Sequence, residues 1–157
     1  MNPSENILLL SISSILMLFA AHINDPPTYD GYTSDQIMIA MTVYMEARGE
    51  PEEGQIQVAR VIRNRVASPR YPNTVQSVIL QPNQFESWAD HNRAKLRAIP
   101  ETDPNTFMKI LRLTAPVTAD GGFLNFHAHT ATPAWASYGT GKTTIGNHIF
   151  YLEALKS

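Results

Sequence analysis

Cysteine is absent from this sequence of 157 residues. Without it there are no disulfide bonds, no thiol nucleophiles and no cysteine-ligated zinc. Glycine and proline number only 8 and 11, which excludes collagen-like and low-complexity chains. The formal net charge of −2 argues against a dedicated nucleic-acid binder, because such proteins carry a strong positive field. With 43% hydrophobic residues, the chain is large enough for one globular domain and too short for two of ordinary size.

Positive charge is also missing from the first 47 residues, since Arg48 is the first basic residue. Residues 29–59 carry six acidic side chains against that one arginine, a net of −5. Residues 60–112 carry nine basic and four acidic side chains, a net of +5. This gradient fits a cleft with a carboxylate on one wall and cations on the other. The alternative, which we favour, is that these charges lie on solvated helix faces that pair with each other.

The N-terminal segment contains an uncharged apolar run at residues 7–21, with 12 apolar residues and three serines. As a helix it would measure about 22 Å, which is shorter than the roughly 30 Å of a bilayer core. Its length suits a signal peptide, although no basic residue precedes it and no clean cleavage site follows. We expect an export or membrane segment, with a helix buried against the domain as the alternative. A turn-rich linker follows, so we expect residues 1–28 to precede a single domain at residues 29–157.

Apolar periodicity predicts an α+β domain that is mostly α-helical, with a small β-sheet near the C-terminus. Thr33-Ser34 suits a helix N-cap, and Gly49 is expected to end that helix. The expected helices span residues 35–48, 51–66, 75–80 and about 104–115, and the expected strands lie within 123–130 and 148–152. Residues 133–141 are expected to form a loop.

Glu46 is the most informative residue, because it lies in the last turn of an otherwise apolar helix. Burial and the negative end of the helix dipole both raise the pKa of a carboxyl group in that position. A carboxyl group that keeps its proton near neutral pH is suited to act as a general acid toward a sugar oxygen. The alternative is a buried ion pair with Arg48, Arg60 or Arg63. Glu50, just past the helix, is a less desolvated candidate for the acid.

Several sequence blocks occur in an order that resembles the SleB-type cell-wall hydrolases, which include spore-cortex-lytic enzymes. The resemblance covers roughly residues 36–151. The N-terminal blocks are Glu46-Ala47-Arg48-Gly49-Glu50, Gly54, Val58-Ala59, Val61-Ile62, Asn64-Arg65-Val66, Pro72-Asn73-Thr74-Val75 and Gln84-Phe85. The C-terminal blocks are Asn125-Phe126-His127, Pro133-Ala134-Trp135 and Ile145-Gly146-Asn147-His148-Ile149-Phe150.

This resemblance implies a lysozyme-like fold and cleavage of peptidoglycan glycan strands, either as a lytic transglycosylase or as a muramidase. By motif, the catalytic glutamate is the first residue of the EARGE block, Glu46. A two-carboxylate glycosidase would need a partner across the scissile bond. The candidates for such a partner are Glu86, Asp90, Glu101 and Asp103. Glu86 departs from the family pattern, where a small polar residue commonly follows Gln-Phe.

Six further residues are candidates for binding the sugar chain, because aromatic rings stack on sugars and amides bond to acetamido groups. They are Gln84, Phe85, Trp88, Asn125, His127 and Trp135. Ordinary core packing is the alternative for the aromatic residues. The expected partner is the peptidoglycan glycan strand, with possible membrane association through residues 7–21 and no nucleic acid. We expect a monomer that uses no metal and no other cofactor.

Two rival functions belong to other classes. The first is a zinc-dependent peptidoglycan amidase or peptidase that uses His127, His129 and His148 as ligands, although a His-Glu-x-x-His motif is absent. The second is a glycan-binding domain without activity. For the favoured enzyme we expect export or membrane tethering and action in the periplasm or cell wall. A phage endolysin of the signal-arrest-release kind and an exported bacterial wall enzyme both fit.

Overall fold

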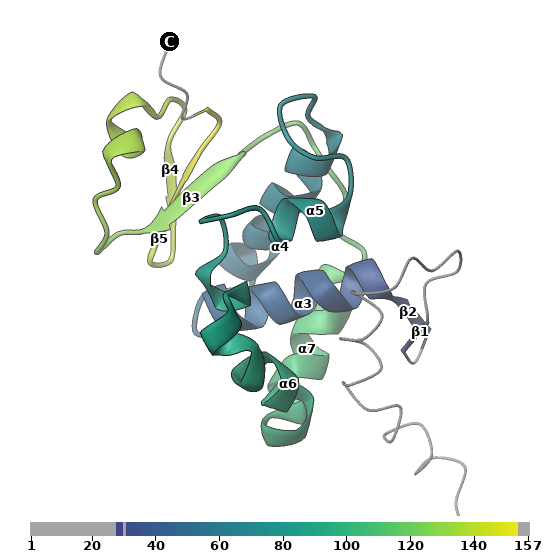
Figure 1. The fold of residues 1–157 in the computed structure, drawn as a ribbon. Coiled ribbons are helices and arrows are strands. Elements are labelled where there is room, and N and C mark those ends of the chain that lie inside the picture. Colours follow the sequence, from purple (N-terminus) through teal and green to yellow (C-terminus); the bar gives the residue numbers. More distant parts are fainter. Residues whose placement is uncertain (1–27, 30, 154–157) are drawn as a thin grey trace, which may run out of the picture.

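Helix α3 (Ser34–Ala47) runs through the middle of the helical part of the protein, with other helices on several sides (Figure 1). The computed structural model describes residues 28–29 and 31–153. A capping box starts α3: the Gln36 amide donates to the Thr33 hydroxyl over 3.3 Å, and the Thr33 amide donates to the Gln36 side chain over 2.8 Å. Residues 37–44 are all buried. The predicted central helix is therefore confirmed.

Four more helices and two 3₁₀ turns contact α3 or one another. They are α4 (Glu52–Ala67), α5 (Val75–Ile79), η1 (Glu86–Trp88), η2 (Asp90–Asn92), α6 (Arg93–Thr102) and α7 (Pro104–Thr114). The Asp103 carboxylate caps α7 by accepting a hydrogen bond from the Thr106 amide over 3.3 Å. The predicted helices agree to within a residue or two, and α6 was not predicted. Arg48, in right-handed helical conformation, forms the C-cap of α3, so Gly49 does not end this helix through a left-handed turn.

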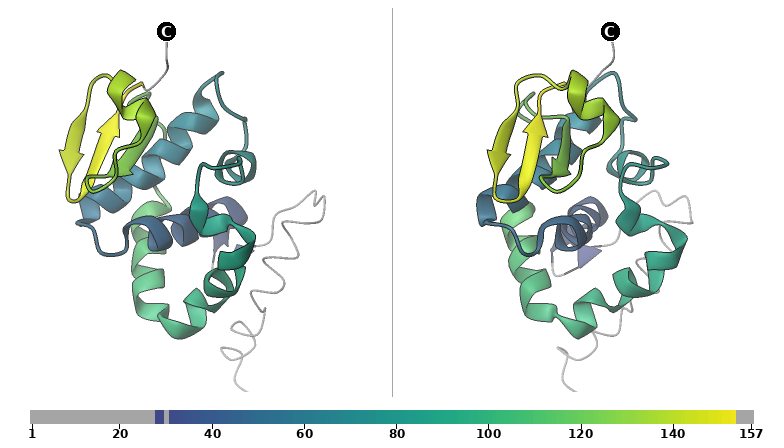
Figure 2. Two further views of the ribbon diagram at one scale, coloured as in Figure 1. Left: turned by 60° about the vertical axis from the view of Figure 1, so that its left-hand side comes forward. Right: turned by 90° about the vertical axis from the view of Figure 1, so that its left-hand side faces the viewer.

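A three-stranded antiparallel sheet forms the C-terminal part and lies beside α4 (Figures 1 and 2). Its strands are β3 (Asn125–Ala128), β4 (Thr143–Ile145) and β5 (His148–Tyr151), in the order β3-β5-β4. β4 and the 3₁₀ turn η3 (Ala134–Tyr138) arise where the sequence predicted no regular element. A separate two-stranded ribbon, β1 (Thr28–Tyr29) and β2 (Tyr32–Thr33), precedes α3. The predicted fold class, helical with a small C-terminal sheet, is confirmed.

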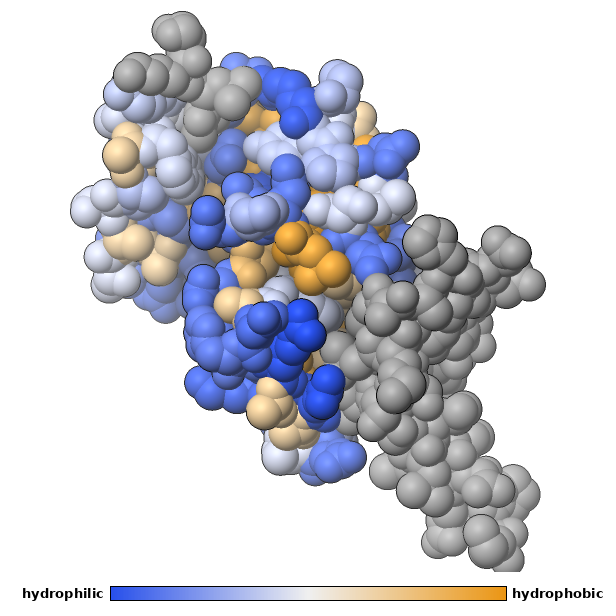
Figure 3. All heavy atoms as spheres, in the orientation of Figure 1, coloured by the Kyte–Doolittle hydropathy of each residue, from blue (hydrophilic) through white to orange (hydrophobic). Residues whose placement is uncertain are grey.

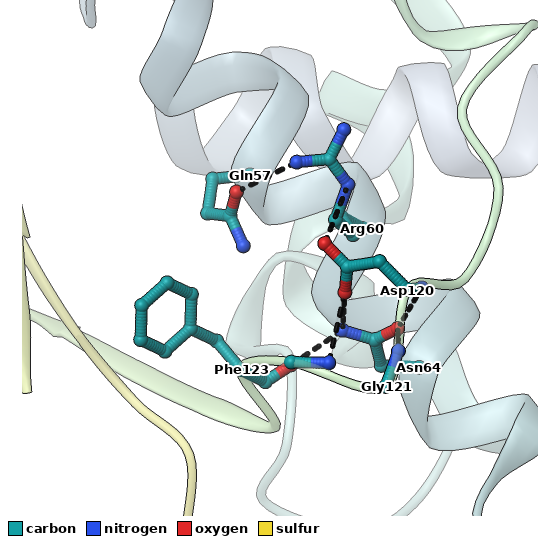
Figure 4. A network of polar contacts seen from close by, with 7 residues as sticks. Gln57, Arg60, Asn64, Asp120, Gly121 and Phe123 are labelled. Carbon is teal, nitrogen blue, oxygen red and sulfur yellow. Dashed lines mark hydrogen bonds and ion pairs between the residues drawn. The ribbon is translucent and has the colours of Figure 1, made fainter. Parts of the chain in front are cut away.

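Asn64 of α4 holds the segment that leads into β3 (Figure 4). Its amide nitrogen donates to Asp120 Oδ1 and to the Phe123 carbonyl oxygen, both over 3.0 Å. Its amide oxygen accepts from the backbone amides of Asp120 and Gly121 over 2.9 and 3.1 Å. Arg60, one turn earlier, pairs with the other carboxylate oxygen of Asp120 at 3.3 Å. These contacts fix the entry of β3 relative to the helices.

The space-filling view is largely hydrophilic, with a small, strongly hydrophobic patch near its centre (Figure 3). Leu80, Tyr138 and Leu152 are the large hydrophobic residues that remain exposed in the described part of the chain. Within that part, none of the helices combines the length and the hydrophobicity that a membrane crossing needs. The predicted segment at residues 7–21 lies outside the described residues, so its prediction stays open.

Candidate functional site

A cleft of about 520 Å³ lies where the helices meet the sheet. Its walls come from the end of α3, from α4 and the segment after it, from the loop before η1, and from the sheet with η3. The lining residues are Glu46, Arg65, Tyr71, Asn83, Gln84, Phe85, Asn125, Phe126, His127, Ala128, Trp135 and His148. β3 is an edge strand, because it pairs with β5 on one side only. The cleft is thus bordered by a strand with a free edge.

Glu46 is partly buried in the last turn of α3. Ser87 donates a hydrogen bond from its hydroxyl to Glu46 Oε1 over 2.7 Å. Burial raises the pKa of Glu46, hydrogen bonds from Ser87 lower it in part, and the negative charge of Glu86 adds to the rise. The net direction is upward, as the sequence argument predicted. A raised pKa keeps the proton that a general acid needs.

The alternative of a buried ion pair at Glu46 is wrong for the described residues, which hold no ion pair to its carboxylate. Arg48 instead lies over the ring of Tyr44, 5.2 Å from its centroid. Arg60 pairs with Asp120. Surface pairing between the acidic and basic segments does occur elsewhere, as Lys109 and Glu52 lie 2.9 Å apart.

Among residues 28–29 and 31–153, Glu46 is the only carboxylate that lines the cleft. Glu50 accepts hydrogen bonds from the Asn147 backbone amide over 2.7 Å and from its side chain over 3.1 Å. Those bonds lower the pKa of Glu50, the opposite of what a general acid needs. Glu86 pairs with His91, and Asp90 pairs with Arg93. Asp103 caps α7 and Glu101 is exposed.

Arg65 is a cleft residue whose placement the sequence reasoning did not predict. It is buried, and its Nε donates to the Leu124 carbonyl oxygen over 2.7 Å. A terminal nitrogen donates to Gln84 Oε1 over 2.9 Å. The guanidinium also lies over the rings of Tyr71 and Phe85, at 5.1 and 5.5 Å from their centroids. One side chain of α4 therefore connects the start of β3, the loop before η1 and two aromatic rings.

Five of the six predicted sugar-binding residues line this cleft together with Glu46: Gln84, Phe85, Asn125, His127 and Trp135. Phe85 is almost fully buried and packs against Phe126, with 6.4 Å between the ring centroids. His127 and Trp135 form an aromatic cluster with Tyr151, in which the three centroid distances are 5.4, 5.5 and 5.5 Å. Asn125 lies within hydrogen-bonding reach of the Tyr71 hydroxyl, at 3.5 Å.

Trp88 is the one residue of the predicted set that does not line the cleft; it lines a smaller pocket that shares Asn83 and Phe85 with it. It is buried in the helical core, where its indole nitrogen donates to the Thr42 hydroxyl over 2.9 Å. Its core packing follows from η1, which directs this residue toward α3. Ser87, its neighbour in η1, is the residue that reaches Glu46.

The three histidines of the zinc alternative do not form a ligand set. Both ring nitrogens of His127 are engaged, with the Ala128 carbonyl at 2.8 Å and the Tyr151 hydroxyl at 3.0 Å. His129 lies beyond the end of β3, is exposed and bonds to the Asn147 carbonyl over 3.1 Å. Across residues 28–29 and 31–153, no three His, Asp or Glu side chains are grouped so as to hold a metal ion. The geometry gives no support to a metal site at these residues.

Comparison with known proteins shows which family this chain resembles. The family model for cell wall hydrolases matches residues 49–151, beginning three residues after Glu46. The spore cortex-lytic enzyme of Halalkalibacterium halodurans is 38% identical over 122 residues, which are 76% of this chain and 36% of that protein. The spore cortex-lytic enzyme of Bacillus subtilis is 35% identical over 131 residues, covering 76% of this chain and 38% of that protein. The chain thus spans well under half the length of these relatives.

Solved structures show the same similarity. The catalytic domain of the germination-specific lytic transglycosylase SleB from Bacillus anthracis is 35% identical and has a TM-score of 0.61, covering 79% of this chain and 99% of that domain. The catalytic domain of the Bacillus cereus SleB protein is 31% identical with a TM-score of 0.54, covering 83% and 98%. The chain therefore belongs to the cell wall hydrolase family.

Proposed function

We propose that this chain cleaves the β-1,4 bond between MurNAc and GlcNAc in peptidoglycan, as a lytic transglycosylase with Glu46 as its acid and base. The observation that carries the proposal is that Glu46 is the one acidic side chain that the described part of the chain brings to the cleft lining. A mechanism with two carboxylates would need a second one there, and this part of the chain supplies none. The similarity to SleB catalytic domains, one of them named a lytic transglycosylase, supports the same reaction.

In the first step, protonated Glu46 donates its proton to the glycosidic oxygen. The bond between that oxygen and the muramic acid C1 breaks, and an oxocarbenium-like centre develops at C1. GlcNAc leaves with a free 4-hydroxyl group. The raised pKa of Glu46 favours this step, because it increases the fraction of enzyme in which the carboxyl group holds its proton.

In the second step, the 6-hydroxyl of the same muramic acid attacks C1, and the Glu46 carboxylate accepts the proton of that hydroxyl. The product is a 1,6-anhydro ring, Glu46 is protonated again, and no water is consumed. An internal hydroxyl is already held near C1, so it replaces the activated water of a hydrolase. The Ser87 hydroxyl orients Glu46 through the 2.7 Å hydrogen bond in both steps.

The remaining cleft residues have supporting roles in this proposal. Gln84 and Asn125 offer amide groups for acetamido and hydroxyl groups of the sugars, and Trp135 with His127 offers ring faces and edges. Arg65 holds Gln84 in place. We further propose that residues 1–28 direct the protein out of the cytoplasm or tether it to the membrane, so that it meets peptidoglycan in the periplasm or cell wall.

Mass spectrometry of the products tests the reaction. Purified peptidoglycan is incubated with the wild type, with Glu46→Gln, and with the matched control Glu53→Gln, which changes an exposed glutamate of α4. Muropeptides one water lighter than hydrolytic products, formed by the wild type and the control but not by Glu46→Gln, are the expected result. Products with ordinary reducing ends would show that the enzyme is a muramidase and not a transglycosylase. Intact glycan with cleaved peptides would contradict the proposal altogether.

A further inference from the structure

His148 lines the cleft, yet neither of its ring nitrogens has a hydrogen-bond partner within the described part of the chain. The residue is only 6% exposed, and its Nδ1 is buried. Buried polar atoms in folded proteins are rarely left without a partner, so Nδ1 is an exception. Nε2 also lacks a partner but is not fully buried, so it is the ring nitrogen that a ligand in the cleft can reach.

The position of the His148 ring is fixed by packing. It lies edge-on to Phe126 at 5.2 Å between centroids and edge-on to Phe150 at 6.1 Å. His148 opposes Ala128 in the pairing of β5 with β3, so it belongs to the same sheet face as Phe126 and Phe150. The ring cannot turn to find another partner without disturbing these contacts.

The ring is neutral at neutral pH. Burial lowers the pKa of His148, and this effect outweighs the upward influence of Glu50; His127 and His129 add to the lowering. A neutral imidazole carries one N–H. On the buried Nδ1 that N–H would be a donor without an acceptor, so we assign the proton to Nε2. Nε2 is then a hydrogen-bond donor.

We infer that His148 is a substrate-binding residue that donates a hydrogen bond from Nε2 to an uncharged oxygen of the glycan, an acetamido carbonyl or a hydroxyl. This inference rests on the proposed function, since it names a contact to the same strand that Glu46 cleaves. Glu46 is borne by helix α3 and His148 by strand β5, so the two side chains reach the cleft from its helical part and from its sheet. A neutral donor suits the many neutral acceptors of an N-acetylated sugar chain.

Three substitutions of His148 distinguish the contributions of its two ring nitrogens. His148→Gln places an amide nitrogen near the position of Nε2, His148→Asn places one near Nδ1, and His148→Phe keeps the aromatic volume with neither. We expect kcat/KM to fall about tenfold in the Phe and Asn variants, the loss typical of one neutral hydrogen bond, and to stay within about threefold of the wild type in the Gln variant. His129→Phe is the matched control, because His129 is exposed and outside the cleft lining.

A residue that only filled space would give a different pattern. In that case the Phe variant would be the mildest of the three, and Gln and Asn would behave alike. Either result, with thermal unfolding showing that the variants are folded, would overturn the inference while leaving the proposed function in place.

Binding keeps the test independent of turnover. Soluble glycan strands freed of their peptides are titrated into Glu46→Gln and into Glu46→Gln combined with His148→Phe. A Kd about tenfold weaker in the double variant supports the contact even if the wild type cleaves no glycan and the proposed reaction fails. An unchanged Kd, or no binding by either protein, overturns the inference.

Discussion

Ser87 and Glu46 lie 41 positions apart in the sequence, and the Ser87 hydroxyl donates a 2.7 Å hydrogen bond to the Glu46 carboxylate. The bond has two consequences for the proposed acid. It fixes one carboxylate oxygen of a residue that lines the cleft. It also stabilises the ionised form, so it offsets part of the rise that burial causes in the pKa of Glu46.

Replacing Ser87 by alanine should therefore raise the pKa of Glu46 further. A general acid must be protonated, so the rate falls as pH rises through that pKa. We expect Ser87→Ala to move this falling limb of the pH–rate profile to higher pH and to lower kcat/KM at the optimum by about tenfold, because the carboxyl group is no longer oriented. Ser77→Ala, an exposed serine outside the cleft, is the control. A limb that stays in place would show that Ser87 does not act on the proton of Glu46.

Burial of Glu46 also makes stability depend on pH. The pKa of Glu46 is higher in the folded protein than in the unfolded chain. At pH values between these two pKa values the folded state therefore binds more protons, and the free energy of unfolding falls as the pH rises. Glu46→Gln removes this buried ionisable group. We expect the variant to be more stable than the wild type at pH 7, by about 1 kcal/mol, and the difference to disappear below the unfolded pKa. Thermal unfolding at pH 7 and at pH 3.5 measures it, and equal stability at pH 7 would contradict the argument.

The sequence was sufficient to predict what depends on local pattern. α3 has apolar residues all round and a Thr33 cap, and both features are properties of consecutive residues. Glu46 could be chosen as the candidate acid for the same reason, because its carboxylate interrupts that apolar pattern. α6 was missed because Pro100 lies inside it and only Leu96 and Ile99 are buried, which leaves too little periodicity to detect.

The rest of the site depends on contacts between distant segments. The Arg65 side chain bonds to Leu124, 59 positions away, and no feature of the helix around Arg65 predicts that partner. The sequence could not place Trp88, because an aromatic residue in a loop is compatible with both a sugar groove and a core. The unpartnered ring of His148 is visible only once the strands are paired. Motif order could point to these segments, but not to the direction of their side chains.

Gly146 tests the contact that Glu50 makes with the β4–β5 turn. Gly146 has φ +58, and a Cβ there would collide with Glu50 Oε2 and lie 2.8 Å from Pro51 Cδ. Gly121 has a similar φ of +74 with nothing near its Cβ position. Gly121→Ala should cost about 1–2 kcal/mol of stability through backbone strain alone, and Gly146→Ala about 2 kcal/mol more through the collision. Denaturant unfolding measures both losses of stability. If the two variants lose the same amount, the loop that contains Glu50 must move aside for the new methyl group at residue 146.

The two tryptophans should respond in opposite ways to substitution. Trp88→Phe removes the hydrogen bond to the Thr42 hydroxyl in the core, so we expect a loss of about 2 kcal/mol in stability with KM for peptidoglycan unchanged. Trp135→Ala removes a ring from the cleft wall, so we expect KM to rise about tenfold with a smaller loss of stability, since Trp135 is only partly buried. Denaturant unfolding and initial rates on the same protein preparations separate the two effects. A raised KM in Trp88→Phe would show that Trp88 contributes to sugar binding. An unchanged KM in Trp135→Ala would show that Trp135 does not.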